Sequence, residues 1–388
     1  MKKRSFFVAA LALAALASCQ GQKGGTDDVA FPELSYSVET SGEGENFMIT
    51  DMIGRKVHVV PGSYERVVCI GAGALRLYSY VADLNLLCGV EDIDNPTLET
   101  RPKMFDNCAR PYFLAGQEVF KTLPSCGVGG PQAQTAEPEK ILACHPDIVI
   151  SEYEDVEKEN ALQEKLGVPV LTLNHGSLGI VNQSVYSSLY MLGTVFGKQQ
   201  RAKELIEFHY ESAKAVFERT KGVNVKKKAY VAGLGNWGTT DQLMTAQNYD
   251  VFKYAHIDNV VSGLPTGGVQ KITEEKFLAL SSDMEMMVFD AAAVKNIRGK
   301  GVDFSTFKAF ETGEVYLQLP YNAYYTNVET ALINMWFVAK SAYPEKLADV
   351  DIAAKANEIT LKFNGVALYE QMKALPMSYG GYQKIANP

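Results

Sequence analysis

The sequence has few of the residues from which metal and catalytic centres are commonly built. It contains five histidines, scattered along the chain, and no Cys-x-x-Cys spacing. A structural zinc site needs four closely spaced Cys or His ligands, so no metal site and no cofactor is assigned from the sequence. It also lacks a Gly-x-Ser-x-Gly elbow, a His-Glu-x-x-His pair and a P-loop lysine. No catalytic set can be assembled, which favours a binding protein over an enzyme.

Positive charge is scarce as well. The chain has 37 Lys and Arg against 45 Asp and Glu, a formal net charge of −8 at pH 7. Apart from Lys2-Lys3-Arg4, the one run of three cations is Lys226-Lys227-Lys228. Nucleic-acid-binding proteins usually present a basic patch, so no nucleic-acid partner is expected.

Long apolar runs are absent after the first twenty residues. At the start, three cations precede twelve apolar residues, Phe6 to Ala17, and Leu16-Ala17-Ser18-Cys19 resembles a bacterial lipobox. Twelve residues are too few to span a bilayer, so residues 1–18 are predicted to be a lipoprotein signal peptide. Cys19 would then be acylated and anchor the protein to a membrane. The polar residues 19–47 are predicted to form a flexible tether.

Five cysteines remain beyond Cys19. Export permits disulfides, but an odd number leaves at least one free thiol. Cys108 and Cys126 lie in the turn-rich stretch 95–130 and are the best placed for a disulfide, although the sequence leaves open whether they form one. Cys69 and Cys144 lie in or beside apolar runs and are predicted to be buried.

The hydrophobic pattern predicts an α/β protein with two lobes. In residues 48–178, short apolar strands alternate with helices, which argues for a parallel sheet; the strands are expected at 66–70, 86–90, 147–151 and 168–173. Residues 179–222 have helical periodicity, including a helix of about 20 residues from 199 to 219 that would be about 30 Å long. Residues 223–388 are predicted to form the second lobe, with strands at 228–232, 284–289 and 315–319 and helices at 328–342 and 352–363.

Two segments repeat one pattern at an offset of 136 residues. Glu139-Lys-Ile-Leu-Ala-Cys-His-Pro-Asp147 and Glu275-Lys-Phe-Leu-Ala-Leu-Ser-Ser-Asp283 share Glu, Lys, Leu, Ala and Asp at equal positions. Pro138 suits the first position of a helix and Thr273 suits an N-cap. Both glutamates then fall at the second helical position, where the helix dipole favours an anion. The repeat indicates two similar lobes, although these residues are also common in any helix.

Ligands of parallel α/β sheets collect at the carboxyl ends of strands, so we expect a cleft there. Aromatic residues with polar tips suit a wet cleft, and tyrosine oxygens suit a hard metal such as ferric iron. Core packing competes for each tyrosine, and Arg76 would otherwise pair with a local acid. Gly71-Ala-Gly73 resembles a dinucleotide turn, but Arg76 stands where the third glycine belongs. The candidate ligand residues are Gly73, Arg76, Tyr112, Tyr153, His175, Trp237, Arg298, Tyr321, Tyr324 and Tyr325.

These segments resemble the periplasmic-binding proteins that serve ABC importers of ferric siderophores, haem and cobalamin. The resemblance rests on Thr50-Asp-Met-Ile-Gly-Arg55, on the strand and loop from Arg66 to Arg76, and on the two repeat segments. It implies two Rossmann-like lobes joined by a single long helix, with the ligand in the cleft between them. Glu139 and Glu275 match the family positions that dock onto arginines of the permease dimer. The resemblance also implies little hinge bending on ligand binding.

The resemblance implies a monomeric substrate-binding lipoprotein that delivers a metal chelate, either an iron complex or cobalamin, to an ABC permease. The expected location is the bacterial cell envelope, facing the periplasm. Gln20 after the acylated cysteine resembles an outer-membrane sorting signal, so a surface lipoprotein that captures the same ligands for an outer-membrane receptor is one alternative. The other is a tetrapyrrole metal chelatase-like enzyme on the same two-lobed plan, which needs a histidine and an acid inside the cleft.

Overall fold

The computed structural model describes residues 29–131, 133–176, 179–235, 240–265 and 267–388. The chain forms two units, Met1–Ala30 and Phe31–Pro388, and the second contains every element of secondary structure given below. The predicted signal peptide (1–18), Cys19 and the first part of the predicted tether lie outside the described residues. No helix of the described part of the chain is long and apolar enough to cross a membrane.

The first lobe is built on a five-stranded parallel sheet with the order β6-β5-β4-β7-β8. Its buried central strands are runs of β-branched and other apolar residues, as expected for a sheet covered on both faces. The strands are β4 (Val67–Ile70), β5 (Leu87–Glu91), β6 (Ser125–Gly127), β7 (Ile148–Ser151) and β8 (Val170–Thr172). The helices are α1 (Ala74–Val81), α2 (Pro111–Phe120), α3 (Pro138–Ala143) and α4 (Val156–Leu166), with short 3-10 turns at Leu84–Leu86 and Asp92–Asp94.

The second lobe contains another five-stranded sheet, ordered β11-β9-β13-β14-β15, in which β15 alone runs antiparallel to its neighbour. A separate antiparallel pair, β10 and β12, lies beside it. The strands are β9 (Lys228–Ala232), β10 (Met244–Ala246), β11 (Asp258–Asn259), β12 (Val269–Lys271), β13 (Met286–Asp290), β14 (Val315–Gln318) and β15 (Gln383–Lys384). The helices are α7 (Asp250–Tyr254), α8 (Glu274–Ala279), α9 (Ala291–Lys300), α10 (Lys308–Glu311), α11 (Val328–Ala342), α12 (Ile352–Asn364) and α13 (Tyr369–Ala374), with a 3-10 turn at Pro376–Ser378.

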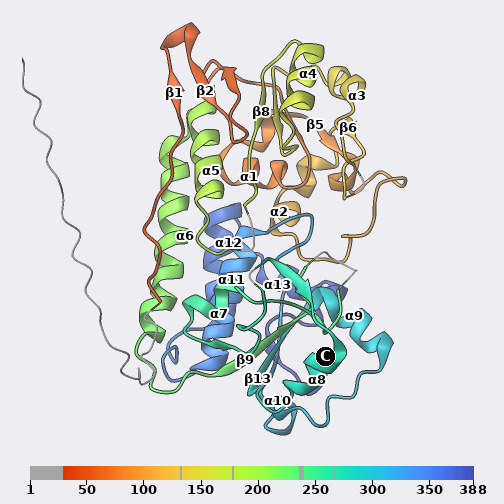
Figure 1. Ribbon diagram of the computed structural model, residues 1–388. Helices are drawn as coiled ribbons and strands as arrows, with labels where there is room; N and C mark the ends of the chain where they lie inside the picture. The colour runs from red at the N-terminus through yellow and green to blue at the C-terminus, as the bar shows by residue number, and fades with distance from the viewer. Residues whose placement is uncertain (1–28, 132, 177–178, 236–239, 266) are drawn as a thin grey trace, which may run out of the picture. The chain divides into compact units, whose positions relative to one another are not determined.

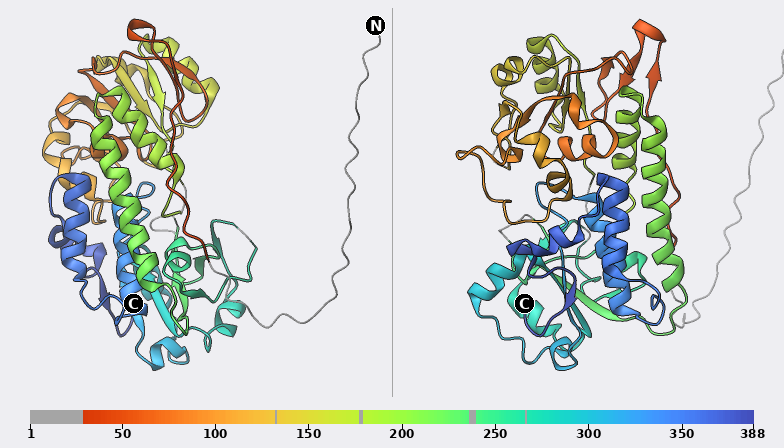
Figure 2. Two further views of the ribbon diagram at one scale, coloured as in Figure 1. Left: turned by 90° about the vertical axis from the view of Figure 1, so that its left-hand side faces the viewer. Right: turned by 180° about the vertical axis from the view of Figure 1, so that it is seen from behind.

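Two helices connect the lobes, α5 (Gln183–Val195) and the 22-residue α6 (Gln199–Thr220). Figures 1 and 2 show α6 running beside both sheets and packed along α5. The apolar face of α6 includes Leu205, Ile206, Ala213 and Val216, all completely buried. The expected α/β fold of two lobes joined by a long helix is therefore confirmed, and the helix predicted at 199–219 differs from α6 by one residue.

The segment between Phe31 and residue 47 is packed onto the helices, so it is not the tether that its polar composition predicted. The Phe31 ring lies 5.4 Å from that of Tyr210 and 5.2 Å from that of Phe217. Farther along, the Ser37 amide donates to Ser187 Oγ at 3.2 Å. Figure 1 shows the first part of this segment lying along α6 up to β1 (Thr40–Ser41). Isolated aromatic anchors in a polar stretch hold it against the helix, which average composition does not reveal.

The Asp-x-x-Gly-Arg motif has a structural role in the first lobe. The motif lies between the paired strands β2 (Met48–Thr50) and β3 (Lys56–His58). A short 3-10 turn, Gly44–Asn46, precedes β2. Asp51 and Arg55 form a buried ion pair of 2.8 Å across the turn. Arg55 also donates to the Val170 carbonyl at 2.5 Å. The motif therefore fixes the hairpin to β8.

The repeated segments occupy equivalent places in the two sheets. Helix α3 leads into β7, which pairs with β4, the first strand of its sheet along the chain. In the same way, α8 leads into β13, which pairs with β9, the first strand of the other sheet. Pro138 is the first residue of α3, and the Thr273 hydroxyl accepts from the Lys276 amide as an N-cap. The buried residues correspond too, because Ile141 is 0% and Phe277 1% exposed. The repeat is therefore a structural one.

The five cysteines beyond Cys19 all have free thiols. Cys126 packs against Cys144 and Val68 in the core of the first lobe, whereas Cys108 packs in another cluster with Phe105 and Tyr324. The Cys108–Cys126 disulfide that the sequence left open is not formed, because the two thiols belong to different apolar clusters. Cys69 and Cys144 are buried, as expected.

Candidate functional site

A pocket of about 520 Å³ lies at the carboxyl ends of β7 and β8. It lies where parallel sheets place their ligands, outside the strand ends. Most of the lining belongs to the first lobe, and Tyr325 comes from the loop that precedes α11 in the second. The lining residues are Gln134, Thr135, Ala136, Pro138, Glu152, Tyr153, Glu154, Asp155, Lys158, Glu159, Ala161, Leu162, Lys165, His175 and Tyr325.

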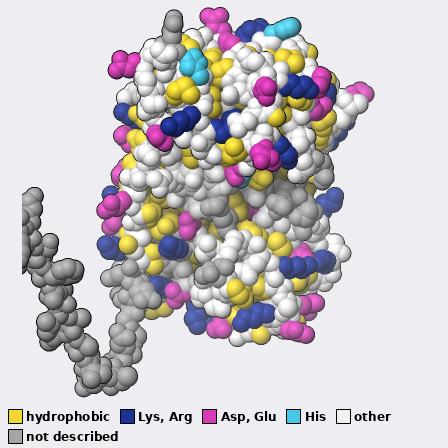
Figure 3. All heavy atoms as spheres, turned by 45° about the horizontal axis from the view of Figure 1, so that its top comes forward, with side chains coloured by type: hydrophobic (Ala, Val, Ile, Leu, Met, Phe, Trp, Pro, Cys, Tyr) yellow, Lys and Arg dark blue, Asp and Glu magenta, His cyan; other side chains and the backbone are white. Residues whose placement is uncertain are grey.

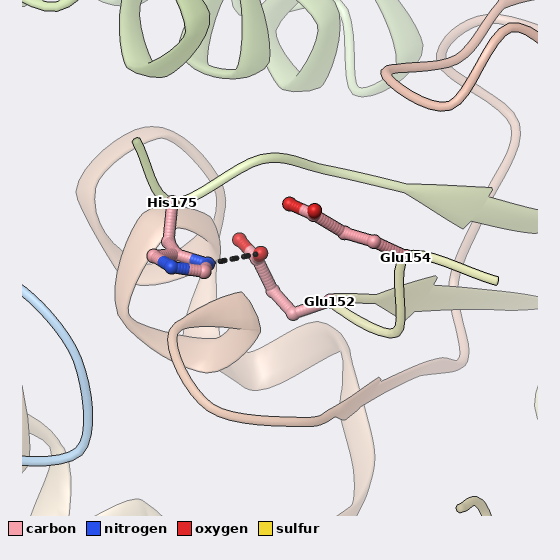
Figure 4. Close-up of side chains that lie close together, drawn as sticks. All are labelled: Glu152, Glu154 and His175. Atoms are coloured by element: carbon pink, nitrogen blue, oxygen red, sulfur yellow. Dashed lines mark hydrogen bonds and ion pairs between the residues drawn. The ribbon is translucent and has the colours of Figure 1, made fainter. Parts of the chain in front are cut away.

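Three ionisable side chains that line this pocket meet in one cluster. Glu152 and Glu154 follow β7 and His175 follows β8, so adjacent strands bring them together (Figure 4). His175 Nδ1 lies 3.1 Å from Glu152 Oε2, and the Asn174 side chain donates from Nδ2 to Glu154 Oε1 at 2.6 Å. Burial raises the pKa of the Glu152 carboxyl, and the neighbouring His175 offsets part of that rise. The cluster joins an imidazole and two carboxylates in one small volume.

An aromatic side chain from the second lobe covers His175. The Tyr325 ring stacks on the imidazole at 3.8 Å with 5° between the planes. Tyr325 is 43% exposed, so its remaining surface and hydroxyl are accessible to a ligand. Tyr153 lines the same pocket from the end of β7. Of the predicted ligand residues, Tyr153, His175 and Tyr325 therefore line the pocket together.

The loop that carries Tyr325 has an unusual backbone. Tyr324 and Tyr325 have φ angles of 58° and 63°, a left-handed conformation that is unfavourable for residues with a β-carbon. Asn327 stabilises the loop by donating from its side chain to the Tyr321 and Ala323 carbonyls at 3.2 and 3.3 Å. The strained conformation turns one tyrosine into the first lobe and leaves the other beside the pocket.

Arg76 holds this loop and does not face the pocket, contrary to the sequence-based expectation. Its guanidinium donates to Asn327 Oδ1 at 3.1 Å and to the carbonyls of Thr326, Ala323 and Tyr324 at 3.0, 3.0 and 2.6 Å. The side chain is also 4.9 Å from the Tyr112 ring centroid and the residue is 1% exposed. These hydrogen bonds join α1 of the first lobe to the loop that precedes α11 in the second lobe.

Tyr324 makes a second connection between the lobes. Its hydroxyl donates to Glu91 Oε2 at 2.7 Å and accepts from the Gly130 amide at 2.9 Å. Glu91 Oε1 accepts from the Gly71 amide at 3.0 Å. Tyr324 is 5% exposed, so it is part of the connection and not of the pocket wall.

The other predicted ligand residues lie elsewhere in the described chain. Gly73 is close to the pocket: it precedes α1 with a φ of 110°, and a β-carbon there would lie 3.3 Å from His175 Cβ. Tyr112 is buried and donates to Asp94 Oδ1, and Tyr321 is 4% exposed. Arg298 donates to the Pro388 carbonyl. Trp237 lies outside the described residues.

Sequence reasoning selected the loop after β7 but took only Tyr153 from it as a ligand residue. Glu152 and Glu154 flank Tyr153 at the carboxyl end of a buried strand, and that placement was a usable signal for both. Lys158 and Lys165 also line the pocket from α4. They sit on an exposed amphipathic helix, which gives no sequence cue that they face a ligand.

Glu91 should make the stability of the fold depend on pH. Burial, with help from Asp94 and Asp92, raises its pKa from 4.5 to about 7, against the hydrogen bonds from Gly71 and Tyr324. Between these values the folded state keeps a proton that the unfolded state has lost, so stability falls as pH rises from 4.5 to 7. A pKa rise of this size corresponds to a loss of about 3 kcal/mol in the free energy of unfolding.

Glu91→Gln removes this titration. We expect urea unfolding to show that, between pH 4.5 and 8, the free energy of unfolding of the variant rises by about 3 kcal/mol relative to that of the wild type. Glu311→Gln, on exposed α10, is the matched control and should leave the pH profile unchanged. If the free energies of unfolding of the wild type and Glu91→Gln differed by the same amount at all pH values, Glu91 would not be the group that titrates.

Known proteins share this fold. A sequence model of the periplasmic binding protein family matches residues 114–301, just under half of the chain. No curated protein sequence is significantly similar to the chain. The molybdate periplasmic binding protein MolA of Haemophilus influenzae has 18% identity and a TM-score of 0.61, over 82% of this chain and 98% of its own.

Two structures from Veillonella parvula are similar to the same degree. A periplasmic solute binding protein has 18% identity and a TM-score of 0.64, over 84% of this chain and 95% of its own. The TroA-like periplasmic binding protein FepB has 20% identity and a TM-score of 0.60, over 82% of this chain and 97% of its own. At such identities the likeness establishes the fold. Over residues 114–301 the chain matches the periplasmic binding protein family, and over most of its length it has the two-lobed fold of periplasmic solute-binding proteins.

Proposed function

We propose that this protein is the substrate-binding lipoprotein of an ABC importer that captures an iron complex, either a ferric siderophore or haem, or cobalamin. The observation that carries the proposal is the pocket at the strand ends, which combines Tyr153, Tyr325 and the Glu152–Glu154–His175 cluster within the fold of solute-binding proteins. Aromatic surface and polar groups together suit a chelate with an organic periphery. Members of this family work with ABC permeases, and delivery to such a permease dimer follows from the proposal.

A location in the periplasm or elsewhere in the cell envelope is part of the proposal, and the family match over residues 114–301 supports it. A lipid on Cys19 after removal of residues 1–18 is the anchor we propose, with residues up to about 30 as the tether. The proposal also includes a monomeric protein with lobes at about 48–178 and 223–388, joined by 179–222. On the face drawn in Figure 3, described acidic and basic side chains are interspersed, which agrees with a partner other than nucleic acid.

Glu139 and Glu275 are the proposed docking residues for the permease. The Glu139 side chain is 77% exposed and pairs with Lys165 at 2.5 Å, and Glu275 is exposed at the start of α8. One turn farther along each helix lies an exposed leucine, Leu142 at 40% and Leu278 at 50%. These leucines occupy equal positions in the repeat. Each lobe thus offers an anion beside an apolar side chain, which suits two equivalent halves of a dimeric partner.

A second candidate function is a tetrapyrrole metal chelatase-like enzyme. Such an enzyme needs a histidine and an acid inside the cleft, and the His175–Glu152 contact of 3.1 Å supplies such a pair. The absence of a wider catalytic set in the sequence and the binding-protein family match favour the first candidate. The two differ in whether the ligand leaves the protein unchanged.

Ligand binding tests the proposed function. Calorimetric titration with ferric siderophores, haem and cobalamin should give one-to-one binding for one of the three classes. Tyr325→Ala should weaken it by about 1–3 kcal/mol, as expected when an aromatic anchor is lost. The matched control is Tyr64→Ala, a partly exposed tyrosine of the first lobe that packs near Phe196. Equal affinity for the wild type and Tyr325→Ala, with equal stability, would remove this pocket as the ligand site.

A further inference from the structure

The cluster of three ionisable side chains in the pocket wall has the donor atoms of a metal site. Glu152, Glu154 and His175 each offer one ligand atom, and these atoms lie within 4.8 Å of one another. Figure 4 shows the Glu152 carboxylate between the His175 ring and the Glu154 side chain. The three residues differ in burial, because Glu152 is buried, His175 is intermediate and Glu154 is exposed.

Glu152 supplies an independent observation. Its side chain is 0% exposed and the whole residue 6% exposed. One carboxylate oxygen, Oε2, faces His175, while Oε1 has no hydrogen-bond partner in the described structure. An unpartnered polar atom at a buried position destabilises the folded state. A fold that keeps a buried carboxylate oxygen free beside an imidazole and a second carboxylate has left a place for a cation.

We propose that Glu152, Glu154 and His175 bind a divalent first-row transition-metal ion directly. Carboxylate oxygens and an imidazole nitrogen are a common donor set for Zn²⁺, Ni²⁺ and Fe²⁺. Two donors of a tetrahedral four-coordinate ion lie about 3.4 Å apart at metal–ligand distances of about 2.1 Å. The donor atoms here lie within 4.8 Å of one another, so they would have to close in by up to about 1.4 Å, a movement that the exposed Glu154 side chain can make.

The site is open towards the pocket. Three protein donors leave at least one coordination position of a four-coordinate ion free, and the adjoining space of about 520 Å³ has room for a small molecule. This step rests on the proposed function, because the ion would be cargo taken up in the same pocket. It would be held alone or with one small ligand, since haem iron and the cobalt of cobalamin keep at most two positions outside the macrocycle, too few for three protein donors. Direct binding of the ion is a property of these three side chains and can be measured by itself.

Titration of the untagged, metal-free protein with Zn²⁺, followed by Ni²⁺, tests the proposal. One ion should bind per chain, and Glu152→Gln, Glu154→Gln and His175→Ala should each weaken binding at least tenfold. Glu157→Gln is the matched control, since Glu157 is exposed in the first turn of α4 outside the cluster. X-ray absorption of the Zn²⁺ form should show one imidazole among oxygen donors.

The outcomes separate the metal site from the proposed function. Thermal unfolding identifies any variant that fails to fold, and the exposed Glu154→Gln then serves as the decisive one. No binding, or binding that Glu154→Gln and His175→Ala leave unchanged, overturns the metal site even if metal chelates still bind. Zn²⁺ binding to the cluster without affinity for any chelate would instead uphold the metal site and contradict the proposed cargo.

Discussion

Arg76→Met is expected to lower the free energy of unfolding by about 3–5 kcal/mol, the range seen when a buried polar network is broken. The substitution keeps an extended side chain but removes the hydrogen bonds that Arg76 donates to four oxygens of residues 323–327. It also removes the support of the left-handed backbone at Tyr324 and Tyr325. Urea unfolding of the wild type and the variant measures the effect.

Arg219→Met is the control for this experiment. Arg219 lies in α6, and its side chain is 37% exposed and pairs with Asp349 at 2.8 Å. Exposed ion pairs contribute about 0–1 kcal/mol, so this variant should remain close to the wild type. Were Arg76→Met as stable as the wild type and deficient only in ligand affinity, Arg76 would be a ligand residue, as the sequence first predicted.

Replacing both Glu139 and Glu275 with Lys should nearly abolish uptake while ligand affinity stays unchanged. Each change reverses a charge that would face a cationic pocket of the permease, so attraction becomes repulsion at two equivalent sites. Neither glutamate is part of the buried core, and an exposed anion in the first turn stabilises a helix only slightly through the helix dipole. Folding should therefore be almost unaffected.

The measurement compares ligand affinity by calorimetry with uptake of the same ligand by cells. Glu118→Lys with Glu311→Lys is the matched control, because it changes the charge equally at one exposed position in each lobe. Control cells should transport normally. Normal transport by the Glu139/Glu275 variant, or loss of its ligand affinity, would show that these residues do not dock the permease.

Most of the fold could be predicted from local sequence patterns. The strand at 228–232 and the helix at 328–342 have the predicted bounds, because each has a strong apolar pattern and clear flanking residues. The two-residue strands β11 and β15 were missed, since Gln383 and Lys384 have no apolar pattern and become a strand only by pairing with β14. Residues 31–47 were misjudged because a few aromatic anchors outweigh a polar composition.

The candidate site was predictable only where strand ends determine it. Tyr153 and His175 lie just past the ends of the adjacent strands β7 and β8, so their clustering follows from sheet geometry. Tyr325 lies in the loop after β14 of the other sheet, so its place beside them depends on how the lobes pack. The partners of Arg76 lie about 250 residues away along the chain, and no local pattern indicates them. Glu152 is similar, because only the folded structure shows that one of its oxygens is buried without a partner.

Native mass spectrometry of the protein with its bound ligand tests the central claim, that this chain binds a metal chelate and releases it unchanged. Protein isolated from its own cell envelope should carry one small molecule per chain, and the released molecule should have the mass and metal content of the ligand supplied. Tyr325→Ala should retain less of it. Release of a tetrapyrrole that has gained or lost its metal would contradict binding alone and support the chelatase-like enzyme.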